Sequence, residues 1–236
     1  MKKILLYLSI GLGALIILAL VAFQYSRSWQ HAFFIDPLFS LDSEEKVIAL
    51  TFDDGPSEIR TPPLLEVLDR YQVKATFFML GQNIEQHPDL AKAVLERGHL
   101  IGNHSYDHPR MIFKSSSFIK EQITKTDVLI RSLGQEEVRY FRPPNTSKFI
   151  TLPLVIKSMG KELVTGTYDP PSEYAASFDA SKVAEEVLAN AKPGSIIYLH
   201  DGKSSDPEQF VESLELIITG LRMQGYRFVR LDYNQN

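Results

Sequence analysis

The feature that most limits the fold of this chain is an alternation, from Lys46 onward, of short apolar runs with segments of helical periodicity. The apolar runs are rich in Val, Ile and Phe, which is typical of βαβ units around a parallel sheet. We expect seven strands, at residues 46–52, 75–80, 99–104, 138–142, 162–168, 195–200 and 226–231. Six crossovers in about 190 residues predict a barrel-like or open α/β domain, slightly short of the ~250 residues usual for eight units.

Helical patterns fill the gaps between these runs. Several of them end at a glycine, as the C-termini of helices commonly do, namely at Gly98, Gly134 and Gly225. The clearest helices are expected at residues 63–71, 87–98, 116–134, 179–191 and 206–225.

The N-terminus forms a separate unit. Residues 4–23 are 20 residues without a charge, and a helix of that length crosses the ~30 Å hydrocarbon core of a membrane. A cleaved signal peptide shares the basic start and apolar centre, but bulky Leu20 stands where a small residue is preferred before a cleavage site at Phe23. The sequence therefore favours a retained single-pass transmembrane anchor over residues 1–23, with a secreted, signal-cleaved form as the alternative.

The anchor also predicts a location for the rest of the chain. Lys2 and Lys3 are expected to hold the N-terminus in the cytoplasm, which places the body on the extracytoplasmic side of the inner, or cytoplasmic, membrane. Residues 24–45 then form a stalk or linker with aromatic residues near the membrane surface, and the folded domain is expected at residues 46–236.

Composition and charge exclude several classes of function. The chain has no cysteine, which excludes a disulfide scaffold, a thiolate zinc site and a cysteine nucleophile, so any metal must bind His, Asp or Glu. Residues 1–30 hold three of the 25 basic side chains and none of the 29 acidic ones, so the remainder carries a net charge of −7. A body of that charge is a poor partner for nucleic acid, and a neutral substrate suits it better.

Polar residues follow the ends of five expected strands, where α/β folds gather their chemistry. Each such segment alone has a structural explanation as a turn, a helix cap or a surface ion pair. Their joint placement at one end of successive strands favours a functional site instead. His31, His87 and His99 do not lie in such a polar segment at the end of an expected strand and are interpreted as structural. The five segments are 51–56 (TFDDGP), 103–109 (NHSYDHP), 141–145 (FRPPN), 168–174 (YDPPSEY) and 199–202 (LHDG).

An aspartate and two histidines among these segments suit a hydrolytic metal site. Carboxylate and imidazole ligands form a hard and borderline set that leaves open positions for water. Side chains of neighbouring strand residues point in opposite directions, so only one of Asp53 and Asp54 is expected to face a metal. The other is then free to act as a base.

In order and spacing, four of these motifs resemble those of the polysaccharide deacetylases of carbohydrate esterase family four. They are TFDDGP, HSYDHP, the Arg-Pro-Pro loop and the terminal Leu-His, and the resemblance covers roughly residues 46–231. It implies an α/β fold of the distorted (β/α)7 barrel type. It also implies a metal-dependent hydrolase that removes N-linked acetyl groups from amino sugars of a cell-envelope or extracellular polysaccharide.

The resemblance implies a role for each matching residue. It makes Asp53 the general base, oriented by Arg142, and His200 the general acid that protonates the departing amine. The implied ligands of a divalent metal, Zn²⁺ first with Co²⁺, Ni²⁺ or Mn²⁺ as alternatives, are Asp54, His104 and His108.

Three motif positions depart from the family pattern. Asn145 stands where the family has a Tyr, but the family uses the main-chain N–H of that residue for the oxyanion, which Asn retains. The family's acid that precedes a Trp is matched by Glu173 before Tyr174, with Asp169 as the other candidate partner of the acid histidine. Tyr198 replaces a usual Leu, which changes the expected shape of the acetyl pocket.

Two other classes of function stay open at this point. A catalytically impaired, membrane-anchored glycan-binding module would keep the same fold with altered motifs. A phosphate-transfer domain with paired aspartates is weaker, because its partners are cytoplasmic and the leading helix exports this body. The substrate polymer, whether peptidoglycan, a chitin-like oligosaccharide or an exopolysaccharide, and its GlcNAc or MurNAc unit are not fixed by the sequence.

Overall fold

The computed structural model describes residues 2–202 and 206–233. Its strands are β1 (Val47–Asp53), β2 (Thr76–Met79), β3 (Leu100–Asn103), β4 (Tyr140–Phe141), β5 (Glu162–Leu163), β6 (Ser195–His200) and β7 (Arg227–Val229). Its α-helices are α1 (Lys2–Arg27), α2 (Thr61–Arg70), α3 (Gly81–Gln86), α4 (Pro88–Glu96), α5 (Ser116–Ser132), α6 (Thr151–Ser158), α7 (Ala180–Asn190) and α8 (Pro207–Met223). Two short 3-10 helices are η1 (Pro144–Thr146) and η2 (Pro171–Tyr174).

The strands form one curled parallel sheet in the order β5-β4-β3-β2-β1-β6. Strand β7 pairs with the first half of β1, while β2 pairs with its second half. The chain after β5 crosses to β6, where the backbone N–H of Thr167 donates to Ile196 O and that of Tyr198 donates to Tyr168 O. The expected fold class, an α/β fold of the distorted (β/α)7 barrel type, is therefore confirmed.

The expected elements are present, and five of the seven strands (β2, β3, β4, β5 and β7) are shorter than the apolar runs suggested. The run at 162–168 illustrates the reason, because only Glu162–Leu163 pairs as a strand before the chain bends toward β6. The five expected helices form, and the expected terminal glycines Gly98, Gly134 and Gly225 all have positive φ. Helices α3 and α6 were not expected, since six and eight residues are too few for a clear helical period.

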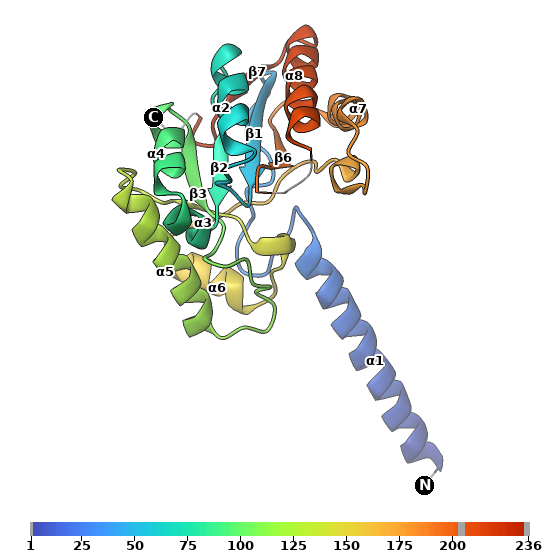
Figure 1. Cartoon of the computed structure of the whole chain (residues 1–236). Helices are drawn as coiled ribbons and strands as arrows, with labels where there is room; N and C mark the ends of the chain where they lie inside the picture. The colour runs from blue at the N-terminus through green and yellow to red at the C-terminus, as the bar shows by residue number, and fades with distance from the viewer. Residues whose placement is uncertain (1, 203–205, 234–236) are drawn as a thin grey trace.

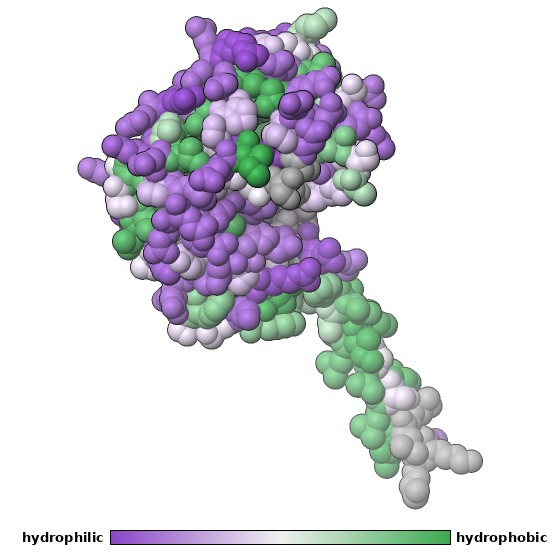
Figure 2. All heavy atoms as spheres, viewed as in Figure 1, coloured by the Kyte–Doolittle hydropathy of each residue, from purple (hydrophilic) through white to green (hydrophobic). Residues whose placement is uncertain are grey.

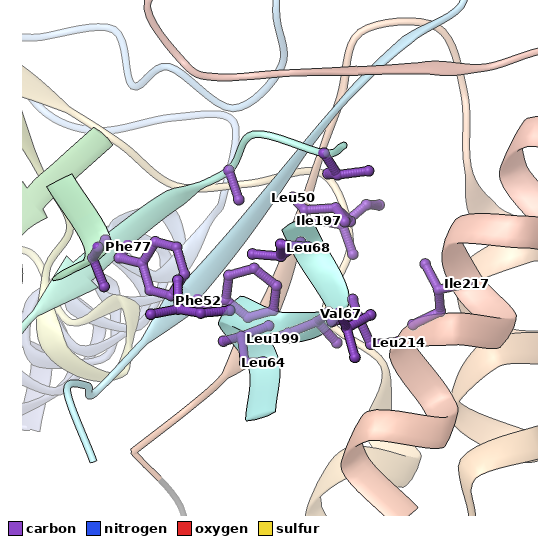
Figure 3. Close-up of a cluster of buried hydrophobic side chains, with 14 of the residues drawn as sticks. Leu50, Phe52, Leu64, Val67, Leu68, Phe77, Ile197, Leu199, Leu214 and Ile217 are labelled. Atoms are coloured by element: carbon purple, nitrogen blue, oxygen red, sulfur yellow. The ribbon is translucent and has the colours of Figure 1, made fainter. Parts of the chain in front are cut away.

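The main hydrophobic core lies between the sheet and the helices α2 and α8 (Figure 3). Every residue of β1 is buried, as expected for a central strand covered on both faces. Phe52 of β1 packs against Phe77 of β2, with ring centroids 5.1 Å apart, and Leu214 and Ile217 of α8 reach the same cluster. Burial of each such side chain contributes about 1.5–3 kcal/mol to the free energy of folding. The position of β1, and of the residues at its carboxyl end, is therefore well fixed.

The segment between α1 and β1 lies along the sheet. Leu38 forms a parallel bridge with Val164, and Ser40 forms an antiparallel bridge with Ser195. Ala32 and Leu41 of this segment are buried in hydrophobic clusters. Residues expected as a stalk therefore pack against the same body as the strands.

Helix α1 projects away from that body (Figure 1). Its apolar side chains are exposed along its length, whereas the face of the body seen in Figure 2 is largely hydrophilic. One helix of this kind near the N-terminus is long and apolar enough to cross a membrane, a property that a signal sequence shares.

Candidate active site

The carboxyl ends of the central strands open onto one cleft of about 470 Å³. Seven of the nine site residues expected from the sequence line it, and the other two, Arg142 and Glu173, lie buried directly behind the lining. Parallel strands bring their carboxyl ends to one edge of a sheet, which explains how motifs far apart in the chain meet here. The seven lining residues are Asp53, Asp54, His104, His108, Asn145, Tyr198 and His200.

Three of these side chains converge as a metal site would require. Asp54 Oδ1 lies 3.4 Å from His104 Nε2 and 3.3 Å from His108 Nε2. The same Asp54 oxygen is buried and has no hydrogen-bond partner, although a buried carboxylate oxygen is costly to leave unpaired. His104 is fixed from behind, because its Nδ1 lies 2.8 Å from the carbonyl oxygen of Arg142. A contact of this kind orients the second ring nitrogen as a ligand.

The protonation states of this group suit metal binding. Burial alone would raise the pKa of Asp54, but the nearby imidazole of His104, 3.4 Å away, outweighs it and holds that pKa below its usual range. Burial, and then the proximity of His104, lower the pKa of His108. Asp54 is therefore ionised and His108 is neutral near pH 7, which are the states in which both side chains bind metal ions.

Asp53 lies beside this group and is paired with a buried arginine. Arg142 Nη1 lies 2.6 Å from Asp53 Oδ1 and 2.8 Å from the hydroxyl oxygen of Thr51. Asp53 Oδ2 is 3.8 Å from His104 Nε2, so both adjacent aspartates face the same cleft. Strand alternation was expected to leave only one of the two facing a metal, and only Asp54 belongs to the candidate metal group. The alternation itself does not hold here, because Asp54 leaves the strand with a φ of 72°.

His200, at the end of β6, is held by a carboxylate on the other wall. Its Nδ1 lies 2.7 Å from Glu173 Oε2, and its backbone N–H donates to Glu173 Oε1 at 2.8 Å. Glu173 is 3% exposed, so this pair is shielded from water, while His200 Nε2 faces the cleft. The arrangement leaves Nε2 as the ring nitrogen of His200 that Glu173 does not bind.

Tyr174 and Asp169 complete this wall. The Tyr174 hydroxyl donates to Asp169 Oδ2 at 2.8 Å and lies 3.2 Å from His200 Nε2. Burial and then the charge of Asp169 raise the pKa of Tyr174, so the phenol keeps its proton. Of the two candidate acids, Glu173 contacts the Nδ1 side of His200, and Asp169 anchors the tyrosine that covers the Nε2 side.

Asn145 and Tyr198 also line the cleft. Asn145, in η1, has a φ of 55°, a left-handed conformation that Asn tolerates better than most residues. Tyr198 lines the cleft one strand away from Asp53, and its ring lies 3.6 Å from Arg142 Cζ.

Sequence analysis missed several residues around the cleft. Asp201 is buried and accepts a hydrogen bond from Thr61 at 2.6 Å, and burial raises its pKa to about 7. Its position directly after His200, in a polar segment at the end of a strand, is the sequence feature that could have pointed to Asp201. Phe23 and Arg27, in the last turns of α1, also line the cleft, and no local pattern pointed to them. His31, His87 and His99 are not among the residues that line it.

Comparison with known proteins assigns the family. Residues 40–164 match the family model for polysaccharide deacetylases. A peptidoglycan-N-acetylglucosamine deacetylase of Bacillus cereus is 34% identical over 199 residues, which are 82% of this chain and 70% of that protein. The chain therefore belongs to the polysaccharide deacetylase family, whose members are hydrolases that act on N-acetyl groups.

Solved structures agree with this assignment. A peptidoglycan N-acetylglucosamine deacetylase crystallised with an N-hydroxybenzamide derivative superposes with a TM-score of 0.77 at 32% identity, covering 82% of this chain and 90% of that one. A family-four pseudoenzyme from Bacillus anthracis superposes with a TM-score of 0.76 at 27% identity, covering 85% and 69%. The fold is thus shared by active and inactive relatives, and the residues in the cleft must distinguish them.

Proposed function

We propose that this chain is a metal-dependent N-deacetylase of peptidoglycan, acting on the N-acetylglucosamine units of the glycan strands. The observation that carries the proposal is that the imidazoles of His104 and His108 converge on one buried, unpaired carboxylate oxygen of Asp54. A candidate base and a candidate acid lie next to this group. The substrate follows from the names of the relatives, two of which act on peptidoglycan N-acetylglucosamine.

The donor set fits a divalent metal. One carboxylate and two imidazoles are ligands that Zn²⁺ and its neighbours accept, and their ligand atoms lie within 4.8 Å of one another. When bound, such a metal supplies Lewis acidity that polarises an acetyl carbonyl and acidifies water. Zn²⁺ is the first choice, with Co²⁺, Ni²⁺ and Mn²⁺ as alternatives.

The chain's own residues account for the two proton transfers of amide hydrolysis. Asp53, held by Arg142, accepts the proton of the water that attacks the acetyl carbonyl carbon. The backbone N–H of Asn145 donates to the oxyanion that develops on the carbonyl oxygen. His200 Nε2 donates its proton to the amine nitrogen as the C–N bond breaks, which gives acetate and a free amine. Glu173 favours the protonated imidazole that this step needs.

An impaired glycan-binding module is the less favoured function. The chain retains a candidate base, a candidate acid and a complete Asp-His-His ligand set in one cleft. None of these groups is replaced by a residue without the necessary chemistry. Retained metal affinity with no turnover on any glycan would identify the impaired module instead.

Acetate release is the direct test. We expect the purified full-length protein in detergent to release acetate from N-acetylated peptidoglycan, and from chitooligosaccharides at a lower rate. Dialysis against a chelator should abolish the release, and added Zn²⁺ or Co²⁺ should restore it. A protein that releases acetate equally well without metal would contradict the assignment of Asp54, His104 and His108.

We assign the apolar helix α1 as a retained membrane anchor with the body outside the cytoplasm. Support comes from its length of 26 residues and its exposed apolar surface. The protein should then stay with membranes through high-salt and alkaline washes, and protease added from the outside should reach the body. A mature protein that begins near Phe23 would show that the segment is a cleaved signal.

A further inference from the structure

Residues Ser28 and Trp29, directly after α1, are hydrogen-bonded to two buried residues that lie beside the catalytic cleft. The buried ammonium of Lys148 donates to the carbonyl oxygen of Ser28 at 2.6 Å. The hydroxyl of Thr165 donates to the carbonyl oxygen of Trp29 at 2.5 Å. These bonds join a segment expected to be a stalk to two loops that lie more than a hundred residues away in the chain.

The indole of Trp29 packs against a residue of the cleft wall. Its ring centroid lies 5.2 Å from that of Tyr198, at an interplanar angle of 37°. Tyr198 is 5% exposed, so Trp29 contributes to covering a ring that would otherwise be open to water. Trp29 itself is not among the residues that line the cleft.

Tyr198 in turn packs against the arginine that holds the base. Arg142 Cζ lies 3.6 Å from the centroid of the Tyr198 ring and 4.0 Å from that of Phe78, and Arg142 is fully buried. Its Nε has no hydrogen-bond partner, so the rings and the bonds of its terminal nitrogens set the place of the guanidinium. One of those bonds, from Nη2 to the carbonyl oxygen of Thr165 at 3.0 Å, ends on the residue whose hydroxyl binds Trp29.

We propose that Trp29 is a positioning residue for the catalytic base: it holds Tyr198 and Thr165, which together place Arg142 and thereby Asp53. The catalytic domain then begins at Ser28, at the end of the membrane-crossing helix, and includes the segment expected as a stalk. This inference rests on the proposed function.

Kinetics of the full-length protein test the role. Trp29→Ala should lower kcat about tenfold or more with KM within about twofold, because a base displaced by a fraction of an ångström slows the chemical step without weakening substrate binding. Trp29→Phe should restore most of the rate, since a phenyl ring still covers Tyr198. Phe33→Ala is the matched control, because Phe33 lies in the same segment and packs on Tyr25 and Phe149 away from the cleft. Equal losses of kcat in Trp29→Ala and Phe33→Ala would overturn the proposal.

A double-mutant cycle tests whether Trp29 acts through Tyr198. In a Tyr198→Leu background, Trp29→Ala should cost much less in kcat than it does in the wild type, because the ring that it supports is gone. Full additivity of the two losses would overturn the proposal.

Fluorescence provides a test that needs no activity. Trp29 is the one tryptophan of the chain, so intrinsic emission reports its surroundings alone. Tyr198→Leu should shift that emission to longer wavelength and make it easier to quench with acrylamide. Unchanged emission would overturn the contact, whereas a lack of acetate release by the wild type would contradict the proposed function alone.

Discussion

The two walls of the cleft carry similar carboxylate and imidazole groups, but these groups differ in their hydrogen-bond partners. On one wall, Asp54, His104 and His108 place their ligand atoms within 4.8 Å of one another, and on the other wall Asp169, Glu173 and His200 do the same. The carboxylate oxygen at the centre of the first group has no hydrogen-bond partner. In the second group, Glu173 binds both the ring and the backbone nitrogen of His200, and Asp169 Oδ2 accepts from the Tyr174 hydroxyl.

We interpret this difference as separating a candidate metal site from a candidate proton-transfer site. Unsatisfied lone pairs that face one point leave room for a cation, whereas a satisfied carboxylate–imidazole pair orients a ring and stabilises its charge. Residue type and spacing alone do not distinguish the two groups, and the hydrogen-bond partners do.

The largest expected effect comes from removing a ligand. Asp54→Ala, His104→Ala or His108→Ala should each lower bound metal sharply and abolish acetate release, since three protein ligands are the minimum for such a site. Metal content is measured by elemental analysis beside activity. His87→Ala is the matched control, because this histidine lies outside the cleft and should leave both quantities unchanged. Stoichiometric metal in all three ligand variants would show that the first wall is not the metal site.

Removing the base or the acid should have the next largest effect and should leave the metal in place. Asp53→Asn and His200→Ala are expected to keep wild-type metal content while losing turnover by roughly a hundredfold or more, the usual scale for general acid–base catalysis. Loss of metal from His200→Ala would erase the distinction between the walls. A near-native rate in either variant would contradict the assigned role.

A smaller effect tests the pairing on the second wall. The Glu173 carboxylate favours the protonated form of His200, so Glu173→Gln should let His200 lose its proton at lower pH. The alkaline limb of the profile of kcat/KM against pH should then move to lower pH. Asp169→Asn, which affects the bond to the Tyr174 hydroxyl instead, should move that limb little. A larger shift in Asp169→Asn than in Glu173→Gln would assign the partnership to Asp169.

The smallest effect on activity is expected at a histidine outside both walls. His99 is 3% exposed, and burial, with the nearby charge of Lys74, lowers its pKa from 6.5 to about 4. The unfolded chain binds a proton there below pH 6.5 and the folded chain does not, so this stability is present above that pH and is lost as the pH falls through about 4. The two pKa values correspond to a loss of roughly 3 kcal/mol.

Replacing His99 by Gln should remove this acid sensitivity. Gln retains an acceptor for the backbone N–H of Ala75, which now donates to His99 Nδ1 at 3.2 Å. Denaturant unfolding between pH 7 and pH 4 should show a shallower fall in the free energy of unfolding for His99→Gln than for the wild type, with kcat unchanged at pH 7. Parallel curves would show that His99 does not titrate in this window.

Much of the fold was determined by the sequence itself. Period-two and continuous apolar runs predict strands because a buried strand must present apolar side chains, and β1 is buried at every position. The motif residues were predictable for a related reason, since parallel strands deliver their carboxyl ends to one edge whatever the details of packing. The family resemblance that these motifs showed is confirmed.

Local conformation within the motifs was decided by the tertiary structure. Strand alternation predicted that Asp53 and Asp54 would diverge, but Asp54 adopts a positive φ and both carboxylates face the cleft. A dihedral angle of that kind depends on what surrounds the turn, and Gly202 leaves the space that it needs, because a Cβ at that position would lie 2.4 Å from Asp54 Cβ. Likewise, the sequence does not distinguish Glu173 from Asp169 as the partner of His200. Only the conformation of η2 decides which carboxylate lies against Nδ1 of His200.

The sequence by itself therefore determined which chemistry is present, because side-chain type sets what can bind a metal, accept a proton or donate one. Only the tertiary structure decided how the first residues after α1 take part. Trp29 lies 169 residues from Tyr198 in the chain, and no pattern near either residue encodes their contact. Such a contact arises because the sheet curls until its two ends share one connecting segment, which brings the end of helix α1 close to the residues around Asp53.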